Sequence, residues 1–391
     1  MATGDFVASV AGGCLAGNCG QEGIQVAMKI GILTSASSPF WTGYAFQFMR
    51  MGHEVELYAL DGNAPRVNAV PVYQVGPEGF DPANDSSRWP YLKCIIPLRR
   101  VLHKNRPDIL MAMYLSSGGL IGSLSGHRGL VVSALGSDVN THIDGRVWTL
   151  VLRWVCRRAK LVHAVSDDLS EKIVRHFEAP ADKMLVAPIG VDTKLLPFVE
   201  SSSRPGCGRI INTRAHKPLY DQATFVRAIK RLKDRNIQFH AIFASNRDVE
   251  LTKELVNQSD IQDKVTFLGG YRDDQLPALL ADADVYVSSS ITDGTSQSLL
   301  EAMCTGLFPV VSDIEANRPW VRHNKNGLLF PVGDDRVLAD QLERAIMAPE
   351  LRAAVAGTNR QIVIDNGDVT SQAKRLLEAF ERLLHKESGR V

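Results

Sequence analysis

The stretch from Ala283 to Val311 constrains the fold of this chain more than any other part of its 391 residues. Ala283–Val287 is an apolar run short enough to be a buried parallel strand, and Gly306–Val311 predicts the next strand. A polar loop rich in Gly and Ser lies between them and leads into a short helix. In an open α/β sheet, ligands bind where strands end and helices begin. The stretch therefore predicts a parallel sheet with a binding site at this loop.

The loop and helix carry the groups that a nucleotide sugar needs. A helix N-terminus offers free N–H groups and the positive end of the helix dipole, which suit a phosphate. Asp293, at the mouth of the loop, and Glu301, on the helix, are carboxylates that accept hydrogen bonds from hydroxyls. Two structural alternatives stay open, because Ser298–Glu301 also fits a capping box and Asp293–Gly294 is typical of a turn.

Seven residues separate Asp293 from Glu301, and this spacing resembles the Glu–seven residues–Glu signature of the family 4 retaining glycosyltransferases, also called glycosyltransferase group 1. The resemblance covers most of the chain after its first 27 residues and is strongest over Arg209–Val337. The chain departs from the family where Asp293 replaces the first Glu and where Thr295–Ser296 replaces an aromatic–Gly pair. Further segments that resemble the family are Glu301–Met303, Gly306, Pro309–Val311 and Asn326–Phe330.

The resemblance implies the GT-B fold, an α/β architecture of two Rossmann-like domains that face each other across a cleft. It also implies a metal-independent retaining hexosyltransferase, which moves a hexose-type sugar from a nucleotide-diphosphate sugar to an acceptor hydroxyl. No cofactor is expected, and the substrate would be a UDP or GDP sugar. The acceptor would be a glycan, lipid-linked or small molecule in the biosynthesis of cell-surface glycans or polysaccharides. A net charge of +1 gives no sign of a nucleic-acid partner.

The order of strands and linkers predicts the domain limits. Residues 1–27 are rich in Gly and Ala, lack the basic start of a secretory signal and are expected to be a disordered leader. Residues 28–203 would form the acceptor-side domain and residues 204–368 the donor-nucleotide domain, joined through the linker at 201–208. In similar enzymes the last helix, here 369–391, packs back on the first domain.

The resemblance assigns the donor site to the second domain. An Arg and a Lys near the end of its first strand would bind the diphosphate, and a turn after a later strand would lie against the base. The alternative for these two cations is simple exposure in a loop. The carboxylate of Glu301 would accept from the ribose hydroxyls, and that of Asp293 from the transferred sugar. The expected donor-binding residues are Arg214, Lys217, Gly270, Tyr271, Gly294, Thr295, Ser296, Gln297, Ser298 and Glu301.

The first domain is expected to supply the acceptor side and a second catalytic carboxylate. Gly43 lies in the loop that follows the first predicted strand. Gly136 and Ser137 follow a buried strand and lead to Asp138. We assign Asp138 a catalytic role together with Asp293, because it would either contact the donor or take the acceptor proton as a general base. The equally weighted alternative is that Asp138 caps the following helix.

Two helices expected at Tyr91–Arg106 and Trp148–Lys160 are basic and amphipathic. Such helices can lie on anionic membranes, but a solvated helix face is the more common explanation and the one that we favour. No apolar run in the sequence reaches the length that spans a bilayer. The chain is therefore expected in the cytoplasm, with peripheral contact at the inner face of the membrane left open and the oligomeric state unknown.

Two rival functions stay open. A GT-B-fold sugar-nucleotide epimerase would share the architecture but use other acids and bases, so the Asp293–Glu301 spacing argues against it. A non-catalytic subunit that binds nucleotide sugars would fit two departures: Gly136–Asp138 stands where many relatives carry a His that faces the donor sugar, and Met111–Met113 is apolar. Asp282 and Asp284 resemble a metal-binding Asp-x-Asp pair. We assign no metal site, because Asp284 leads into a buried strand and the resemblance implies a fold that needs no metal.

Overall fold

The computed structural model describes residues 27–38, 40–63, 69–82, 89–143, 145–199, 208–245, 248–272 and 274–388. The predicted leader, apart from Ala27, and the linker up to Cys207 lie outside the described residues. The chain divides into two compact units. The first comprises the chain up to Ile189 together with the segment from Val369 onward, and the second comprises Gly190–Asp368.

The first unit is built on a parallel sheet, which within the described residues has seven strands in the order β3-β2-β1-β4-β5-β6-β7. Every residue of Ile109–Met113 is buried, as expected for a central parallel strand that is covered on both faces. The strands are β1 (Lys29–Thr34), β2 (Glu54–Ala59), β3 (Val72–Gln74), β4 (Ile109–Met113), β5 (Leu130–Ala134), β6 (Leu161–Ala164) and β7 (Met184–Val186).

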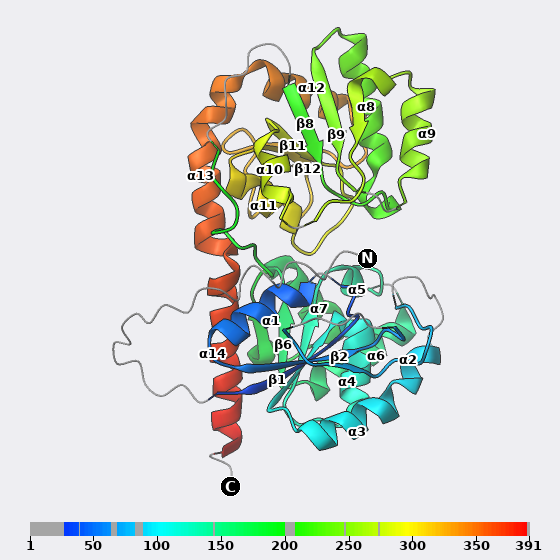
Figure 1. The fold of residues 1–391 in the computed structure, drawn as a ribbon, viewed down its shortest axis with the longest axis vertical. Coiled ribbons are helices and arrows are strands. Elements are labelled where there is room, and N and C mark those ends of the chain that lie inside the picture. The colour runs from blue at the N-terminus through cyan, green and yellow to red at the C-terminus, as the bar shows by residue number, and fades with distance from the viewer. Residues whose placement is uncertain are drawn as a thin grey trace, which may run out of the picture. The chain divides into compact units, whose positions relative to one another are not determined.

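Helices cover this sheet, and the C-terminal helix is one of them. Helix α14 (Val369–Ser388) contacts α1 (Phe40–Arg50), and the rings of Phe48 and Phe380 lie 6.0 Å apart at their centroids (Figure 1). A π-helical turn over Tyr114–Gly118 follows β4. The other helices of the first unit are α2 (Trp89–Lys93), α3 (Ile95–Asn105), α4 (Gly119–Ser125), α5 (Ser137–Asn140), α6 (Arg146–Arg158) and α7 (Asp167–Phe177).

The second unit repeats the architecture with a parallel sheet in the order β10-β9-β8-β11-β12-β13. The predicted α/β class, with two Rossmann-like parallel sheets, is therefore confirmed. The strands are β8 (Gly208–Asn212), β9 (Phe239–Phe243), β10 (Val265–Phe267), β11 (Val285–Ser288), β12 (Phe308–Ser312) and β13 (Leu328–Phe330). The helices are α8 (Gln222–Asp234), α9 (Glu250–Gln258), α10 (Leu276–Ala281), α11 (Gln297–Thr305), α12 (Asp335–Met347) and α13 (Pro349–Gly367).

The division between the units lies at Ile189, fourteen residues before the limit that the sequence predicted at residue 203. The segment after Gly190 belongs to the second unit because it is bonded to the end of α13. The Val191 N–H donates to the Gly367 carbonyl at 2.8 Å, and the Thr193 hydroxyl donates to Asp368 at 2.7 Å. These contacts join positions more than 170 residues apart, which a linker composition cannot reveal.

None of the helices in the described ranges combines the length and the apolar character that crossing a bilayer requires.

The side chain of His163, on β6, is fully buried between two partners. Its Nε2 lies 2.6 Å from the Ala187 carbonyl, which can only accept, so Nε2 carries the proton and Nδ1 accepts from the Ser133 hydroxyl at 3.0 Å. Burial lowers the pKa of His163 to about 4. Between pH ~6.5 and ~4, this side chain is therefore protonated in the unfolded chain but stays neutral in the folded one.

We expect the free energy of unfolding to fall as the pH drops from about 6.5 to about 4, with His163 accounting for roughly 3 kcal/mol of that loss. The contribution is fully present above pH ~6.5, where the ring is neutral in both states. Urea unfolding of the wild type and of His163→Gln, at pH values between about 7 and 4.5, measures it. A variant that loses stability with the same pH slope as the wild type would contradict the assignment.

Candidate functional site

Arg214 follows the C-terminal end of β8, and its backbone is held in place by polar side chains. The side-chain oxygen Oδ1 of Asn212 accepts from the Arg214 N–H at 2.9 Å and from the Gln222 side-chain amide at 3.1 Å. Asn212 is fully buried, so these bonds are made away from water. The first residues of α8 therefore fix the loop that presents Arg214.

The guanidinium of Arg214 gathers side chains from the loop before α11. Its Nη2 donates to Asp293 Oδ2 at 2.6 Å, and its Nη1 donates to the hydroxyls of Ser296 and Ser298, both at 3.2 Å. The guanidinium also lies over the Tyr220 ring, with 4.0 Å between the guanidinium carbon and the ring centroid. The structure thus brings together four of the residues that the sequence assigned to the site, from loops about 80 positions apart.

The two loops are also joined through their backbones. The Ser289 hydroxyl lies 2.9 Å from the Tyr220 carbonyl and 2.8 Å from the Asp221 carbonyl. The Ile291 N–H donates to the Leu219 carbonyl at 2.9 Å. Ser289 is fully buried, so these bonds are shielded from water. The position of Asp293 relative to Arg214 is therefore set by several bonds and not by the ion pair alone.

The start of α11 excludes one of the structural alternatives. The N-cap is Ser296, whose hydroxyl accepts from the Leu299 N–H at 3.3 Å. A capping box would need Glu or Gln three residues after the N-cap, and that position is Leu299. Glu301 lies two residues further along, half-buried, and so does not close a capping box with Ser298. The interpretation of Ser298–Glu301 as a capping box is wrong for this reason.

The site couples a buried cation to a carboxylate. The side chains of Arg214 and Asp293 are 11% and 16% exposed. Burial disfavours the charged guanidinium, but the Asp293 carboxylate, with Tyr220 and Tyr286, outweighs it and raises the pKa of Arg214 above its ordinary value. Arg214 Nε is buried without a hydrogen-bond partner among the described residues. The guanidinium therefore stays charged and keeps donor capacity beyond its bond to Asp293.

The remaining residues that the sequence assigned to this loop make contacts closer to it. The Asp293 Oδ1 accepts from the Gly294 N–H at 2.9 Å, and Thr295 is buried. Gln297 donates from its side chain to the Gly190 carbonyl at 3.1 Å, which ties the start of α11 to the backbone at the beginning of the second unit. Gln297 is thus engaged with the protein, whereas Ser296 and Ser298 face the guanidinium.

Three predicted donor residues lie further from this cluster or at its edge. Lys217 is exposed at the N-terminal end of the 3₁₀ turn Pro218–Tyr220. Gly270 and Tyr271 follow β10, which is separated from β8 by β9. Adjacent strands are roughly 5 Å apart, so the end of β10 lies roughly 10 Å from the end of β8 at the same edge of the sheet. That span suits a base and a diphosphate bound side by side.

Asp138 holds two loops of the first unit together. Its carboxylate is buried and accepts from the Leu115 N–H at 2.5 Å, from Leu135 at 3.0 Å and from Gly136 at 2.9 Å. Burial raises the pKa of Asp138, while these N–H donors act to lower it. Leu115 follows β4 and the other two donors follow β5. The carboxylate therefore fixes these two loops, which favours a positioning role over either proton transfer or a simple helix cap.

The three residues predicted for the acceptor side, Gly43, Gly136 and Ser137, have different surroundings. Gly136 has a φ of +126°, which L side chains rarely adopt, and Ser137 is exposed. Gly43 was predicted in a loop, but it lies inside α1, where a Cβ would be 3.6 Å from Val369 on α14. The predicted loop position is wrong because α1 begins at Phe40, earlier than the polar run suggested.

Sequence reasoning missed three residues that organise the site. Tyr220 stacks on Arg214, and Asn212 orients its backbone. Tyr286, on β11, is fully buried, and its hydroxyl lies 2.8 Å from the Ser298 hydroxyl. In the sequence Tyr286 belongs to an apolar run and has the appearance of a core residue. It carries a hydroxyl and comes just before a predicted ligand-binding loop, and this is the signal that could have identified it.

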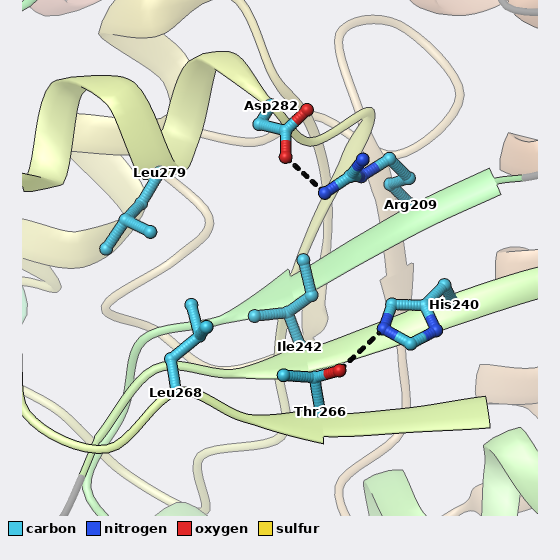
Figure 2. A pocket seen from close by; sticks show the side chains of 7 residues that line it. All are labelled: Arg209, His240, Ile242, Thr266, Leu268, Leu279 and Asp282. Atoms are coloured by element: carbon cyan, nitrogen blue, oxygen red, sulfur yellow. Dashed lines mark hydrogen bonds and ion pairs between the residues drawn. The ribbon is translucent and has the colours of Figure 1, made fainter. Parts of the chain in front are cut away.

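A separate cavity of about 150 Å³ lies against the face of β8, β9 and β10 and is closed on one side by α10 (Figure 2). An ion pair between Arg209 and Asp282 and a 2.8 Å contact between His240 Nε2 and the Thr266 hydroxyl line it. None of the predicted site residues contributes to it. The other residues that line the cavity are Ile242, Leu268 and Leu279.

The two carboxylates of the Asp-x-Asp pair face different arginines. Asp282 pairs with Arg209, whereas Asp284 is buried, pairs with Arg352 at 3.7 Å and accepts from the Arg209 N–H at 2.9 Å. Both carboxylates therefore form ion pairs with arginine side chains of the protein. In the described part of the chain, no group of three or more His, Cys, Asp or Glu residues could hold a metal ion.

Two family models match the chain, one in each half. Residues 43–195 match the model described as glycosyltransferase family 4, and residues 210–362 match the one described as glycosyl transferases group 1. Together these ranges cover well over half of the chain.

Curated relatives are distant. The chain is 23% identical over 295 residues to glycosyltransferase 1 domain-containing protein 1 of Xenopus tropicalis, covering 70% of this chain and 84% of that protein. It is 26% identical to the putative colanic acid biosynthesis glycosyltransferase WcaL of Escherichia coli K12, covering 61% of each. It is 29% identical to the MMP alpha-(1->4)-mannosyltransferase of Mycolicibacterium hassiacum, covering 60% of this chain and 59% of that protein. The matches to the last two therefore span about three fifths of those relatives.

Solved structures share the fold. A sucrose-phosphate synthase from Thermosynechococcus elongatus superposes with a TM-score of 0.80 at 16% identity, covering 92% of this chain and all of that one. Anabaena Alr3699/HepE in complex with UDP superposes with a TM-score of 0.72 at 19% identity, covering 91% of this chain and all of that one. At such identities these likenesses establish the two-domain GT-B architecture.

Proposed function

The chain belongs to the group 1, family 4 glycosyltransferases, and from that premise we propose that it transfers a hexose-type sugar from a nucleotide-diphosphate sugar to an acceptor hydroxyl, with retention of configuration and without a metal. The observation that carries the proposal is the Arg214 guanidinium held at the N-terminus of α11 by Asp293, Ser296 and Ser298. A fixed cation beside free helical N–H groups is a site for a diphosphate.

The proposed reaction breaks the bond between the anomeric carbon and the diphosphate and forms one to the acceptor oxygen on the same face of the sugar. Negative charge grows on the departing diphosphate, and the acceptor proton passes to one of its oxygens. Arg214 and the first N–H groups of α11 would stabilise that charge, a role that a metal ion fills in other enzymes. Glu301 would accept from the ribose hydroxyls and Asp293 from the sugar.

The ion pair with Asp293 is compatible with this role. The guanidinium has five N–H donors, and the hydrogen bonds described for it use its two terminal nitrogens. An ionised carboxylate has about four lone-pair sites, and Asp293 uses one to Arg214 and one to Gly294. A diphosphate and a sugar hydroxyl can therefore be added without breaking the pair. The pair would then orient Asp293 toward the sugar bound to that diphosphate.

The names of the relatives suggest which donor to test first and which pathway to consider. The name of one Escherichia coli relative, 25% identical over 266 residues, specifies a UDP-Gal-dependent galactosyltransferase acting on a diphosphoundecaprenol-linked sugar. HepE structures were determined with UDP and with UDP-glucose. We propose a UDP sugar as the first donor to test and a glycan or lipid-linked acceptor in polysaccharide or lipopolysaccharide assembly.

Donor binding can be tested by thermal shift with UDP, GDP, ADP and their sugars, each with and without EDTA. A ligand at about 100 times its Kd stabilises the native state by about 2.7 kcal/mol, which raises Tm by several degrees. We expect one nucleotide class to raise Tm regardless of EDTA, and Glu301→Ala to weaken that nucleotide about tenfold by removing the ribose acceptor.

Glu254→Ala is the matched control, because Glu254 is an exposed helical glutamate on α9. Its response to nucleotides should equal that of the wild type. If no nucleoside diphosphate raises Tm at millimolar concentration, the proposed donor site is wrong. If Glu301→Ala and Glu254→Ala respond alike, the role given to Glu301 is wrong.

Product analysis separates transfer from the rival functions. Proton NMR of the reaction mixture reports the coupling of the anomeric proton in donor and product. The proposal predicts a new glycoside with the donor's anomeric configuration. An epimerised nucleotide sugar as the sole product would favour the epimerase, and donor binding without turnover across a broad set of acceptors would favour a non-catalytic subunit.

A further inference from the structure

One face of the first unit exposes large apolar side chains between arginines. Helices α3 and α6 lie on this face on either side of α4, which contacts both. Figure 1 shows these helices with α2 in the first unit. We call the exposed part of α2, α3 and α6 the α2–α6 surface. The apolar side chains that it exposes are Leu92 (44%), Ile96 (62%), Val147 (73%), Leu150 (62%) and Trp154 (42%).

The apolar side chains on α6 form a stripe. Val147, Leu150 and Trp154 are separated by three and four residues, so they follow one side of the helix. The opposite side of α6 faces the core through Leu152, Val155 and Cys156. The helix therefore has two apolar sides, and the protein covers one of them.

The helices that form this surface carry charge of one sign. The segments 89–106 and 146–160 each contain five Lys and Arg residues and no Asp or Glu, although the whole chain has a net charge of only +1. Arg146 and Arg158 are exposed at the two ends of α6. Arg153 and Arg157 pair with Glu178, at 2.6 and 3.4 Å, which neutralises part of the local charge.

The fold directs the apolar end of this surface toward the ligand edge of the sheet. In a strand–helix–strand unit the helix runs antiparallel to its strands, so its N-terminus lies near their carboxyl ends. Helix α6 starts at Arg146 and α3 at Ile95, which places Ile96, Val147 and Leu150 at that edge. The loop at Gly136–Asp138, after β5, lies at the same edge.

We propose that the α2–α6 surface binds the surface of a bilayer that contains anionic phospholipids. The apolar side chains would enter the headgroup region, and the arginines would contact lipid phosphates. A second copy of the chain is the less favourable occupant. A two-fold interface would place these helices, which carry no Asp or Glu of their own, against their copies and bring like charges together. The proposal does not depend on the sugar-transfer reaction.

The test is co-flotation of the full chain with vesicles of phosphatidylcholine alone or mixed equally with phosphatidylglycerol. We expect binding to the anionic vesicles, weakened by salt, and at least tenfold weaker binding to the neutral ones. Replacing Leu150 and Trp154 together by Ser should weaken binding to anionic vesicles about tenfold or more, because two apolar anchors are lost. Arg146→Gln with Arg158→Gln should weaken it and reduce its salt dependence.

Controls come from the second unit. Leu251 on α9 is 70% exposed, and Arg336 is exposed on α12, so Leu251→Ser and Arg336→Gln match the substitutions in type and exposure. Both should bind like the wild type. Failure of the wild type to float with anionic vesicles, or equal binding by the Leu150/Trp154 variant, would overturn the proposal.

Self-association is the other informative outcome. A wild-type dimer in lipid-free solution that the Leu150/Trp154 variant converts to a monomer would assign the surface to a second copy instead. Stabilisation of the same variants by nucleotides, measured without lipid, reports on the donor site separately. A failed lipid assay with intact nucleotide binding would therefore overturn this inference and leave the proposed function standing.

Discussion

Arg214→Gln is expected to lower kcat/KM for sugar transfer by about 10²–10³-fold, because it removes a fixed cation from the diphosphate as charge develops there. The substitution replaces the charged guanidinium by a neutral amide, which still has N–H donors but is two bonds shorter. Steady-state kinetics with the donor that the thermal-shift panel identifies measures the effect. If kcat/KM falls by less than threefold, the diphosphate does not bind at Arg214.

Two further variants separate chemistry from loop structure. Arg214→Lys keeps a positive charge but loses the planar fork, so we expect an intermediate loss of activity. Asp293→Asn keeps the shape of the pair but removes the carboxylate, and it should lower activity while Arg214 still binds the nucleotide. An Asp293→Asn variant that lost nucleotide binding as completely as Arg214→Gln would show that the pair acts only to hold the two loops.

Asp284→Ala is expected to destabilise the second unit strongly. It leaves Arg352, which is 2% exposed, without its carboxylate partner and removes the acceptor of the Arg209 N–H. Breaking a buried ion pair by removing one partner costs roughly 3–5 kcal/mol. Calorimetry should show Tm lower by roughly 10 °C or more for the transition of the second unit.

The partner substitution and an exposed control complete this test. Arg352 also donates to the carbonyls of Ala345 and Ile346, at 2.5 and 3.0 Å, so Arg352→Ala additionally leaves the end of α12 without its cap. It should destabilise at least as much as Asp284→Ala. Arg336→Ala, at an exposed position of α12, should change the unfolding free energy by no more than about 0.5 kcal/mol. Comparable small changes in all three variants would refute the account of a buried pair.

The sequence was informative where structure depends on local pattern. The apolar runs predicted buried parallel strands, and the polar loop before Gln297 predicted the start of α11. Arg214 was expected at the end of the first strand of its domain, and it follows β8. These inferences succeed because strand burial and helix starts are encoded over a few adjacent residues.

Pairings between distant positions could not be predicted in the same way. Nothing near Asp293 in the sequence indicates that it contacts Arg214, or that Asp138 accepts from the Leu115 N–H. The register of the N-cap was also missed, since Ser296 and Ser298 are chemically equivalent candidates separated by two residues. Tertiary packing decides which hydroxyl meets the helix N-terminus.

The α2–α6 surface shows how a helical pattern can leave two structures open. The basic residues of α6 fit both a solvated face and a lipid-binding one, and we favoured the first. The structure changes that balance because Val147 and Leu150, which the sequence pattern would allow in the core, are exposed. Their exposure depends on which side of α6 packs against α4 and α7, and a single helix does not encode that choice.

The most direct measurement is calorimetric titration of the wild type and of Arg214→Gln with the preferred nucleoside diphosphate and with its monophosphate. If Arg214 and α11 bind the terminal phosphate, the wild type will bind the diphosphate about 10–100 times more tightly than the monophosphate. Arg214→Gln will lose most of that difference while its affinity for the monophosphate changes little. Equal affinities of the wild type for both ligands, or a preference that survives in Arg214→Gln, would contradict the proposed donor site.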